Sequence, residues 1–253
     1  ISQAVEGDQI WVKGSDTGGG LVYRPDEGPN VTPGDQNASF EMESDVQIYG
    51  GFEGTETELD QRDPETYVTI LSGDIDQDGQ LDGDNSYSVV TTGPGVGPTS
   101  VLDGFTITAG NNTSASDENG GGMRINGGSL GSSPRINNCI ISNNNSAAAG
   151  GGVYVDGGMP SFTNCDITDN TAADGAGITV EHGLGVGGST EPYLINCAFI
   201  NNAATASGGA LSSFGVTKPR LHNCLIFNNQ ANVGGGLYLI GGSSGGFGDP
   251  VRL

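Results

Sequence analysis

Basic residues are scarce in this 253-residue chain, which has eight lysines and arginines against thirty aspartates and glutamates. The formal net charge of −22 argues against a nucleic-acid partner, because proteins that bind nucleic acid present a basic surface to the phosphates. The sequence also lacks an apolar run long enough for a membrane-spanning helix. An acidic chain of this kind favours cations as its ligands.

Aromatic residues are few as well, at 6% of the chain with a single tryptophan, whereas glycine is abundant at 46 residues. Such a composition is poor for the core of a globule but suits a thin column with many turns. Only two histidines are present, and no Cys-x-x-Cys pair occurs, which argues against a zinc-type site.

The chain does contain a ladder of four cysteines, each preceded by an asparagine and followed five residues later by another asparagine. The spacings between the cysteines are 26, 32 and 27 residues, and a repeat of that length predicts a stacked solenoid. The four units begin at a proline and contain Cys139, Cys165, Cys197 and Cys224.

A second block follows each cysteine and consists of small residues and a short apolar alternation, as in Gly150-Gly-Gly-Val153-Tyr-Val155. Strands of this kind bury one face only, so they need stacked neighbours to complete a core. We therefore predict an all-β fold, a right-handed parallel β-helix solenoid of roughly nine coils. Residues 1–98 would form acidic N-terminal coils with a calcium-type loop, and residues 99–253 the regular Asn/Cys/Gly coils of the same continuous helix.

The repeat predicts which side chains point inward and which form corners. The asparagines are expected at corners, where they tolerate left-handed backbone and can hydrogen-bond along the stack. The cysteines are expected to be small buried side chains with free thiols, although a disulfide between neighbouring coils remains an alternative. Two further inward columns are predicted, one of Ile136, Phe162, Leu194 and Leu221 and one of Ile141, Ile167, Phe199 and Ile226.

Several of these segments resemble a known family. Phe199-Ile-Asn-Asn202 followed by Gly208-Gly-Ala-Leu211 resembles the repeats of polymorphic outer-membrane proteins and other pectin-lyase-like β-helix surface proteins of bacteria. Upstream, Gly7-Asp-Gln-Ile-Trp-Val12 and Ile48-Tyr-Gly-Gly-Phe52 are similar to the start of secreted bacterial β-helix proteins. The resemblance implies a secreted or cell-surface protein, but β-helices include lyases, hydrolases, adhesins and plain scaffolds.

The acidic segment from residue 74 to residue 85 has the spacing of a calcium loop. Oxygen-bearing side chains alternate along it, and Gly79 stands at the sixth position, where a sharp turn is needed. The twelfth position departs from the pattern, because Asn85 replaces the usual bidentate glutamate. We predict a structural Ca²⁺ site, with a solvated acidic loop as the alternative. The candidate ligands are Asp74, Asp76, Asp78, Gln80, Asp82 and Asp84.

Catalytic residues are not evident. A polysaccharide lyase needs a base beside a bound uronate, and a hydrolase needs convergent carboxylates, yet Asp156 and Asp174 are expected in separate turns. Glu181-His182-Gly183 partly resembles a pectin-hydrolase motif but has glutamate in place of the first glycine. Arg62 is expected to be an ion-pairing turn residue. We therefore predict no catalytic residue and no organic cofactor.

Three functions from different classes remain. The first is a non-catalytic extracellular structural protein, a β-helix that stacks end to end with identical subunits into a filament, sheath or surface layer. The second is an adhesin or glycan-binding module of a larger surface protein. The third is a polysaccharide lyase or hydrolase. The first is the main prediction. An open last coil exposes strand edges that another chain can cover, and this favours either of the first two functions over the enzyme.

Overall fold

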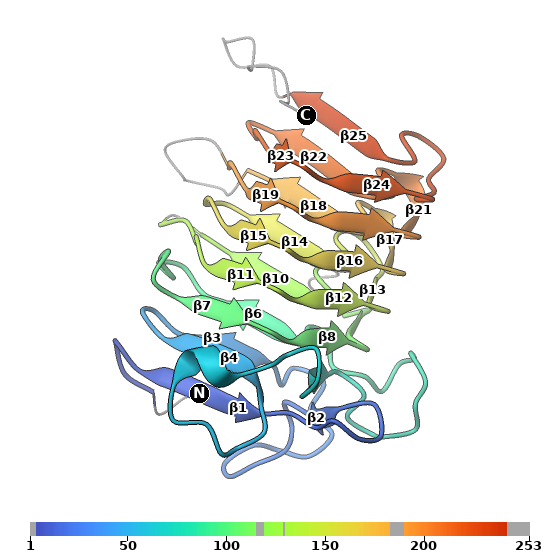
Figure 1. Ribbon diagram of the computed structural model, residues 1–253. Helices are drawn as coiled ribbons and strands as arrows, with labels where there is room; N and C mark the ends of the chain where they lie inside the picture. The colour runs from blue at the N-terminus through green and yellow to red at the C-terminus, as the bar shows by residue number, and fades with distance from the viewer. Residues whose placement is uncertain (1–3, 115–118, 129, 183–189, 242–253) are drawn as a thin grey trace.

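A computed structural model describes residues 4–114, 119–128, 130–182 and 190–241 of the chain. Within these residues almost all regular structure is β-strand, and the strands stack into a column with three long faces (Figure 1). Each face is a seven-stranded parallel sheet, and a fourth sheet of four short strands forms a corner. The predicted all-β parallel β-helix is confirmed.

The four sheets are numbered 1 to 4, and within each sheet the neighbouring strands come from successive coils, one strand from each coil. Sheet 1 contains β1 (Gln9–Lys13), β4 (Gln47–Phe52), β7 (Val101–Asp103), β11 (Arg135–Asn137), β15 (Ser161–Thr163), β19 (Tyr193–Ile195) and β23 (Arg220–His222). Sheet 2 contains β2 (Leu21–Tyr23), β5 (Thr69–Ser72), β8 (Thr106–Thr108), β12 (Ile140–Ser142), β16 (Asp166–Thr168), β20 (Ala198–Ile200) and β24 (Leu225–Phe227). Sheet 3 contains β3 (Phe40–Met42), β6 (Val90–Thr92), β10 (Met123–Asn126), β14 (Val153–Asp156), β18 (Ile178–Glu181), β22 (Leu211–Gly215) and β25 (Leu237–Gly241). Sheet 4 contains β9 (Asn111–Asn112), β13 (Asn145–Ser146), β17 (Thr171–Asp174) and β21 (Ala203–Ser207).

The described residues form seven coils, numbered here by the strands of sheet 1, whereas the repeat period predicted about nine. The difference arises at the N-terminal end. Gln9 pairs with Gln47 and Gln47 with Val101, so the first two coils are 38 and 54 residues long. Later coils are shorter, as the 26-residue step from Arg135 to Ser161 illustrates. Long loops between strands account for the extra length of the first coils.

The predicted inward columns are confirmed by the strand register. Ile136 pairs with Phe162, and Phe162 with Leu194, and all three are fully buried. Ile167 and Phe199 are likewise adjacent and fully buried in sheet 2. A single coil could not bury these side chains alone, so the apolar core is a property of the stack.

The asparagines form two kinds of ladder. The corner ladder confirms the prediction, whereas the buried ladder differs from it, because all the asparagines were expected at corners. Asn164, just before a cysteine, lies at a corner with a φ of 54° and donates to the Asn138 side chain at 3.1 Å. Asn170, five residues after the same cysteine, is fully buried, accepts from the Asn144 amide at 3.1 Å and donates to Asn202 at 3.0 Å. The Asn170 side chain also accepts from the backbone N–H of Asn144 at 3.0 Å and donates to the Ile141 carbonyl at 2.9 Å, so the buried asparagines satisfy backbone groups of the neighbouring coil.

The four cysteines are free thiols, which confirms the main prediction and not the alternative of disulfides between coils. Cys139 and Cys165 are buried, and each thiol donates to a carbonyl of the preceding coil, as from Cys165 to Ile136 at 3.4 Å. Burial, the largest cause, raises the pKa of Cys139 to about 12. The cysteine column therefore serves as part of the core.

Candidate functional site

The acidic loop brings half of the predicted calcium ligands together. One carboxylate oxygen from each of Asp74, Asp76 and Asp78 lies within 4.8 Å of the others. Loss of hydration, followed by the charge of Asp78 and the hydrogen bond and charge of Asp74, raises the pKa of Asp76. The buried Oδ1 of Asp74 has no hydrogen-bond partner within the described part of the chain. These donors are of the oxygen type that Ca²⁺ prefers.

The second half of the loop is arranged differently. Asp82 and Asp84 lie outside this cluster, and the Asp84 amide donates to the Asp82 carboxylate at 3.1 Å. Asn85 is fully buried, where it accepts from the Asp82 amide at 2.9 Å and donates to the Ala109 carbonyl at 2.8 Å. The residue that departs from the calcium-loop pattern therefore anchors the loop to coil 3. The backbone N–H of Gln80 donates to the Asp78 carboxylate at 2.7 Å. The Arg24 side chain donates to the backbone carbonyl of Asp74 at 2.6 Å.

A second feature is the excursion of residues 53–68, which leaves coil 2 and contains the short 3-10 helix η1 (Leu59–Gln61). Its turns are closed by its own side chains. The carboxylate of Glu56 accepts from the amides of Glu53 and Gly54 at 2.6 and 2.8 Å, and Gln61 accepts from the Thr57 amide at 2.8 Å. These bonds make the excursion a preorganised wall beside the column.

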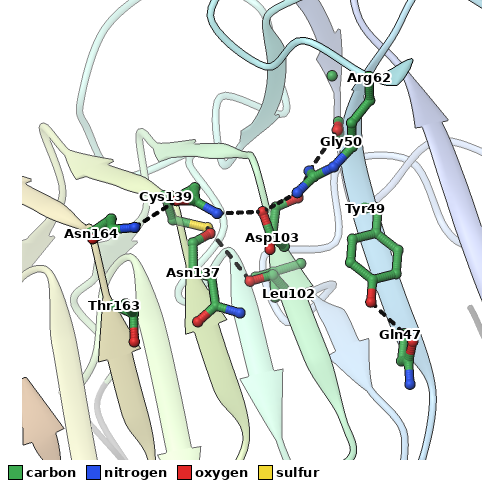
Figure 2. A network of polar contacts seen from close by, with 12 residues as sticks. Gln47, Tyr49, Gly50, Arg62, Leu102, Asp103, Asn137, Cys139, Thr163 and Asn164 are labelled. Atoms are coloured by element: carbon green, nitrogen blue, oxygen red, sulfur yellow. Dashed lines mark hydrogen bonds and ion pairs between the residues drawn. The ribbon is translucent and has the colours of Figure 1, made fainter. Parts of the chain in front are cut away.

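Arg62 holds this wall against the column, and the predicted ion pair is confirmed (Figure 2). Its guanidinium lies 2.6 Å from the Asp103 carboxylate, donates to the Gly50 carbonyl at 3.0 Å, and lies over the Tyr49 ring at 5.2 Å. Asp103 also accepts from the Asn138 side chain at 2.9 Å. The corner ladder that contains Asn138 and Asn164, called here the outer ladder, therefore ends at the Arg62–Asp103 pair. Because a carboxylate can only accept, Asp103 sets the direction of donation along the ladder.

Close approach of the wall requires glycine at two positions. Gly51 has a φ of 90°, and a Cβ there would lie 2.6 Å from the Cα of Pro64. Gly104 has a φ of 83°, and a Cβ there would lie 2.6 Å from the Arg62 guanidinium. Glycine alone fits both the backbone conformation and the space.

Between the wall and the column lies a groove of about 800 Å³. Leu59, Asp60, Pro64, Glu65 and Val68 line it from the wall. The column contributes outer side chains of coils 3 to 5, namely Thr106, Asn138, Ile140, Asn164 and Asp166, together with Cys139. Sequence reasoning missed this groove, because Glu65 and Asp166 are 101 positions apart and no local pattern links them.

One expectation about the carboxylates was wrong. Asp156 and Asp174 end strands β14 and β17 rather than lying in turns, because both strands extend past their apolar residues. Asp156 pairs in register with Glu181, whose carboxylate accepts from the Tyr154 hydroxyl at 2.8 Å. The next residue, His182, is partly exposed, and its buried Nδ1 has no partner among the described residues. The glycine that completes this motif lies outside the described residues.

The sequence of residues 96–247 matches the family model of the right-handed beta helix region. This match covers more than half of the 253 residues. The chain belongs to the right-handed beta helix family. Comparison of the sequence with curated proteins and with solved structures gave no match.

Membership of the right-handed beta helix family establishes the architecture and leaves the activity open, because the family includes enzymes and non-enzymes. Among the helices of the described residues, none has the length and apolarity needed to cross a membrane. The candidate sites of this right-handed beta helix protein are therefore the acidic loop and the groove.

Proposed function

We propose that this chain is a non-catalytic structural protein of the cell exterior, a rigid β-helix stiffened by Ca²⁺. The observation that carries the proposal is the continuity of the repeating contacts. The buried ladder from Asn144 through Asn170 and Asn202 to Asn229 joins four successive coils, each through a side-chain hydrogen bond of 2.9–3.1 Å. An unbroken ladder over an unbroken apolar core makes a stiff rod, which is what a surface structure needs.

In this proposal Ca²⁺ neutralises the acidic loop. Asp74, Asp76 and Asp78 would supply three oxygen ligands, and repulsion between them would be relieved by the cation. The loop contacts coil 1 through Arg24 and is anchored to coil 3 through Asn85. A cation there would therefore stiffen the N-terminal coils. These coils carry most of the negative charge, since twenty of the thirty acidic residues of the sequence lie before residue 85.

The proposal extends to end-to-end stacking. On coil 7 the core residues Cys224, Ile226 and Leu237 are only partly buried, and the outer face presents Leu225 and Phe227 at 54% and 62% exposure. A further coil packed on this edge would bury the first three and continue the asparagine ladders. Stacking by a second copy of the chain is the arrangement that would build a filament or sheath.

The test of the calcium part compares unfolding midpoints in Ca²⁺ and in chelator. Ca²⁺ at a hundred times its dissociation constant should stabilise the chain by about 2.7 kcal/mol. Asp76→Asn should abolish this gain, and in chelator it should be as stable as the wild type or more so, because it removes a repelled charge. Asp156→Asn is the matched control and should keep the full Ca²⁺ response. Equal midpoints with and without Ca²⁺ would refute the calcium site.

Electron microscopy tests the filament part separately. At micromolar concentration with Ca²⁺ we expect fibres with an axial repeat of at least roughly 30 Å, since seven coils rise about 4.8 Å each. Chelation should shorten or disperse them. Single rods in both conditions would contradict stacking while leaving the calcium proposal intact.

A glycan-binding module is the second candidate, and one observation favours it. Trp11 is 37% exposed on the outer face of sheet 1 and is held by stacking on Phe52, with ring centroids 4.8 Å apart. The amides of Gln9 and Gln47 lie beside it, joined at 3.2 Å. A fixed indole next to amide groups suits a sugar ring. Loss of glycan-array binding in Trp11→Ala, compared with Phe214→Ala, would test this candidate.

A further inference from the structure

The charge of the groove is unbalanced. Asp60, Glu65 and Asp166 are exposed in it, and their carboxylates have no hydrogen-bond or ion-pair partner within the described part of the chain. The lining contains one cation among the described residues, Arg62, and Asp103 already neutralises it at 2.6 Å. The groove therefore presents three negative charges without a counter-charge, which attracts a cationic partner.

The apolar part of the lining is aliphatic. Leu59, Pro64 and Val68 line the wall, and Ile140 on the column is 45% exposed. No aromatic ring is among the described residues that line the groove. Sugars pack their apolar faces on flat aromatic rings, so this lining is suited to aliphatic side chains of a peptide instead.

The floor also offers groups that match a peptide backbone. Asn138 and Asn164 use one N–H each in the outer ladder, with distances of 2.9 and 3.1 Å to their acceptors. A primary amide has two N–H donors and two acceptor positions, so each retains hydrogen-bonding capacity beyond the ladder. Both side chains are exposed and line the groove.

The site is built before any ligand arrives. The internal hydrogen bonds of the excursion fix the wall, and Arg62 together with the bridge between Val68 and Ser15 ties it to the column. A volume of about 800 Å³ lies in the range of ligand sites, which is roughly 300–1,000 Å³. A preformed groove reduces the ordering cost of binding.

From these observations we propose that the groove binds an extended basic peptide segment of a partner protein. Lysine or arginine side chains of the segment pair with Asp60, Glu65 and Asp166, and its aliphatic side chains pack on Leu59 and Ile140. The peptide runs between the wall and coils 3 to 5. This inference does not depend on Ca²⁺ binding or on filament formation.

Fluorescence anisotropy tests the proposal, with the labelled peptide Lys-Leu-Lys-Leu-Lys-Leu as the probe and the full chain at physiological salt. The triple variant Asp60→Asn, Glu65→Gln, Asp166→Asn should weaken binding at least tenfold. These carboxylates hold nothing else in the described structure, so the variant should fold, and circular dichroism verifies that it does.

A second triple variant controls for the acidic surface as a whole. Glu6→Gln, Asp16→Asn and Glu41→Gln remove the same charge from exposed positions outside the groove and should change affinity less than twofold. Ile140→Ser should weaken binding several-fold without changing its dependence on salt, since it removes apolar contact only.

Three results would overturn the proposal. One is an equal loss of affinity in both triple variants, which would mean attraction to the acidic surface in general. Another is the absence of binding by the lysine-leucine peptide. The third is displacement of the bound peptide by a neutral hexasaccharide such as cellohexaose, which would assign the groove to a glycan.

Discussion

Replacing Asn170 by aspartate changes one NH₂ group into an oxygen at the centre of the buried ladder. The Asn170 amide nitrogen donates to the Ile141 carbonyl at 2.9 Å and to the Asn202 Oδ1 at 3.0 Å. Its oxygen accepts from the backbone and side-chain nitrogens of Asn144 at 3.0 and 3.1 Å. An aspartate keeps the oxygen that accepts from Asn144. Its second oxygen replaces the nitrogen and faces two other acceptors, the Ile141 carbonyl and the Asn202 Oδ1.

The expected cost follows from burial. Asn170 has no exposed surface, so an ionised aspartate in its place would be an uncompensated buried charge, which costs about 3–5 kcal/mol. The introduced side chain will instead hold its proton, with a folded-state pKa well above the value of about 3.9 in the unfolded chain. Stability relative to the wild type is then least affected below about pH 4 and falls as the pH rises, by about 1.4 kcal/mol per unit, until the folded-state pKa is reached.

Urea unfolding of Asn170→Asp from pH 3.5 to pH 8 measures this dependence. Asn164→Asp is the matched control, because it makes the same chemical change on the same coil at an exposed corner where aspartate also tolerates a φ of 54°. Its cost should stay within about 1 kcal/mol and vary little with pH. Similar costs for the two variants, or a flat pH profile for Asn170→Asp, would show that the buried ladder does not act as we argue.

Three further predictions concern the wall and the core. Arg62→Met should destabilise the chain by about 3 kcal/mol, since it leaves Asp103 with 10% of its side chain exposed and no cation, and a glutamyl endopeptidase should then cut residues 53–68 faster. Gly51→Ala should cost about 1–3 kcal/mol in urea unfolding, because its Cβ meets the Pro64 backbone at 2.6 Å, and an unchanged midpoint would contradict the close approach. Cys139, with its pKa raised to about 12, should react with iodoacetamide at pH 8 only when the chain unfolds, which mass spectrometry of native and urea-treated samples can measure.

The repeat made much of the fold predictable. In a stacked coil each residue contacts the same position of the next coil, so aligning the sequence with itself gives the contacts directly. This is why Phe162 and Leu194 could be paired, and why Asn164 could be assigned to a left-handed corner, from the sequence alone. In the acidic loop, the spacing of a calcium loop, and not the repeat, pointed to the alternating carboxylates Asp74 to Asp78, which the structure brings together.

Aligning the sequence with itself could not predict contacts between different positions of the repeat, or the lengths of irregular loops. The number of coils depended on how much chain the loops of coils 1 and 2 absorb, which the regular period could not reveal. The role of Asn85 as an anchor to Ala109, and the pairing of Asp156 with Glu181, required the actual strand register.

The sequence by itself determined the column and its corner ladder of asparagines, because both follow from residue type and spacing within one repeat, and composition alone determined its acidic character. Only the tertiary structure decided the groove, in which Asp60 and Glu65 of the wall lie across from Asp166 of coil 5. The physical reason is that the wall is folded back by Arg62 on Asp103 and by glycines that allow close approach. Those contacts have no counterpart in the other coils as far as the structure describes them, so no repeat encodes them.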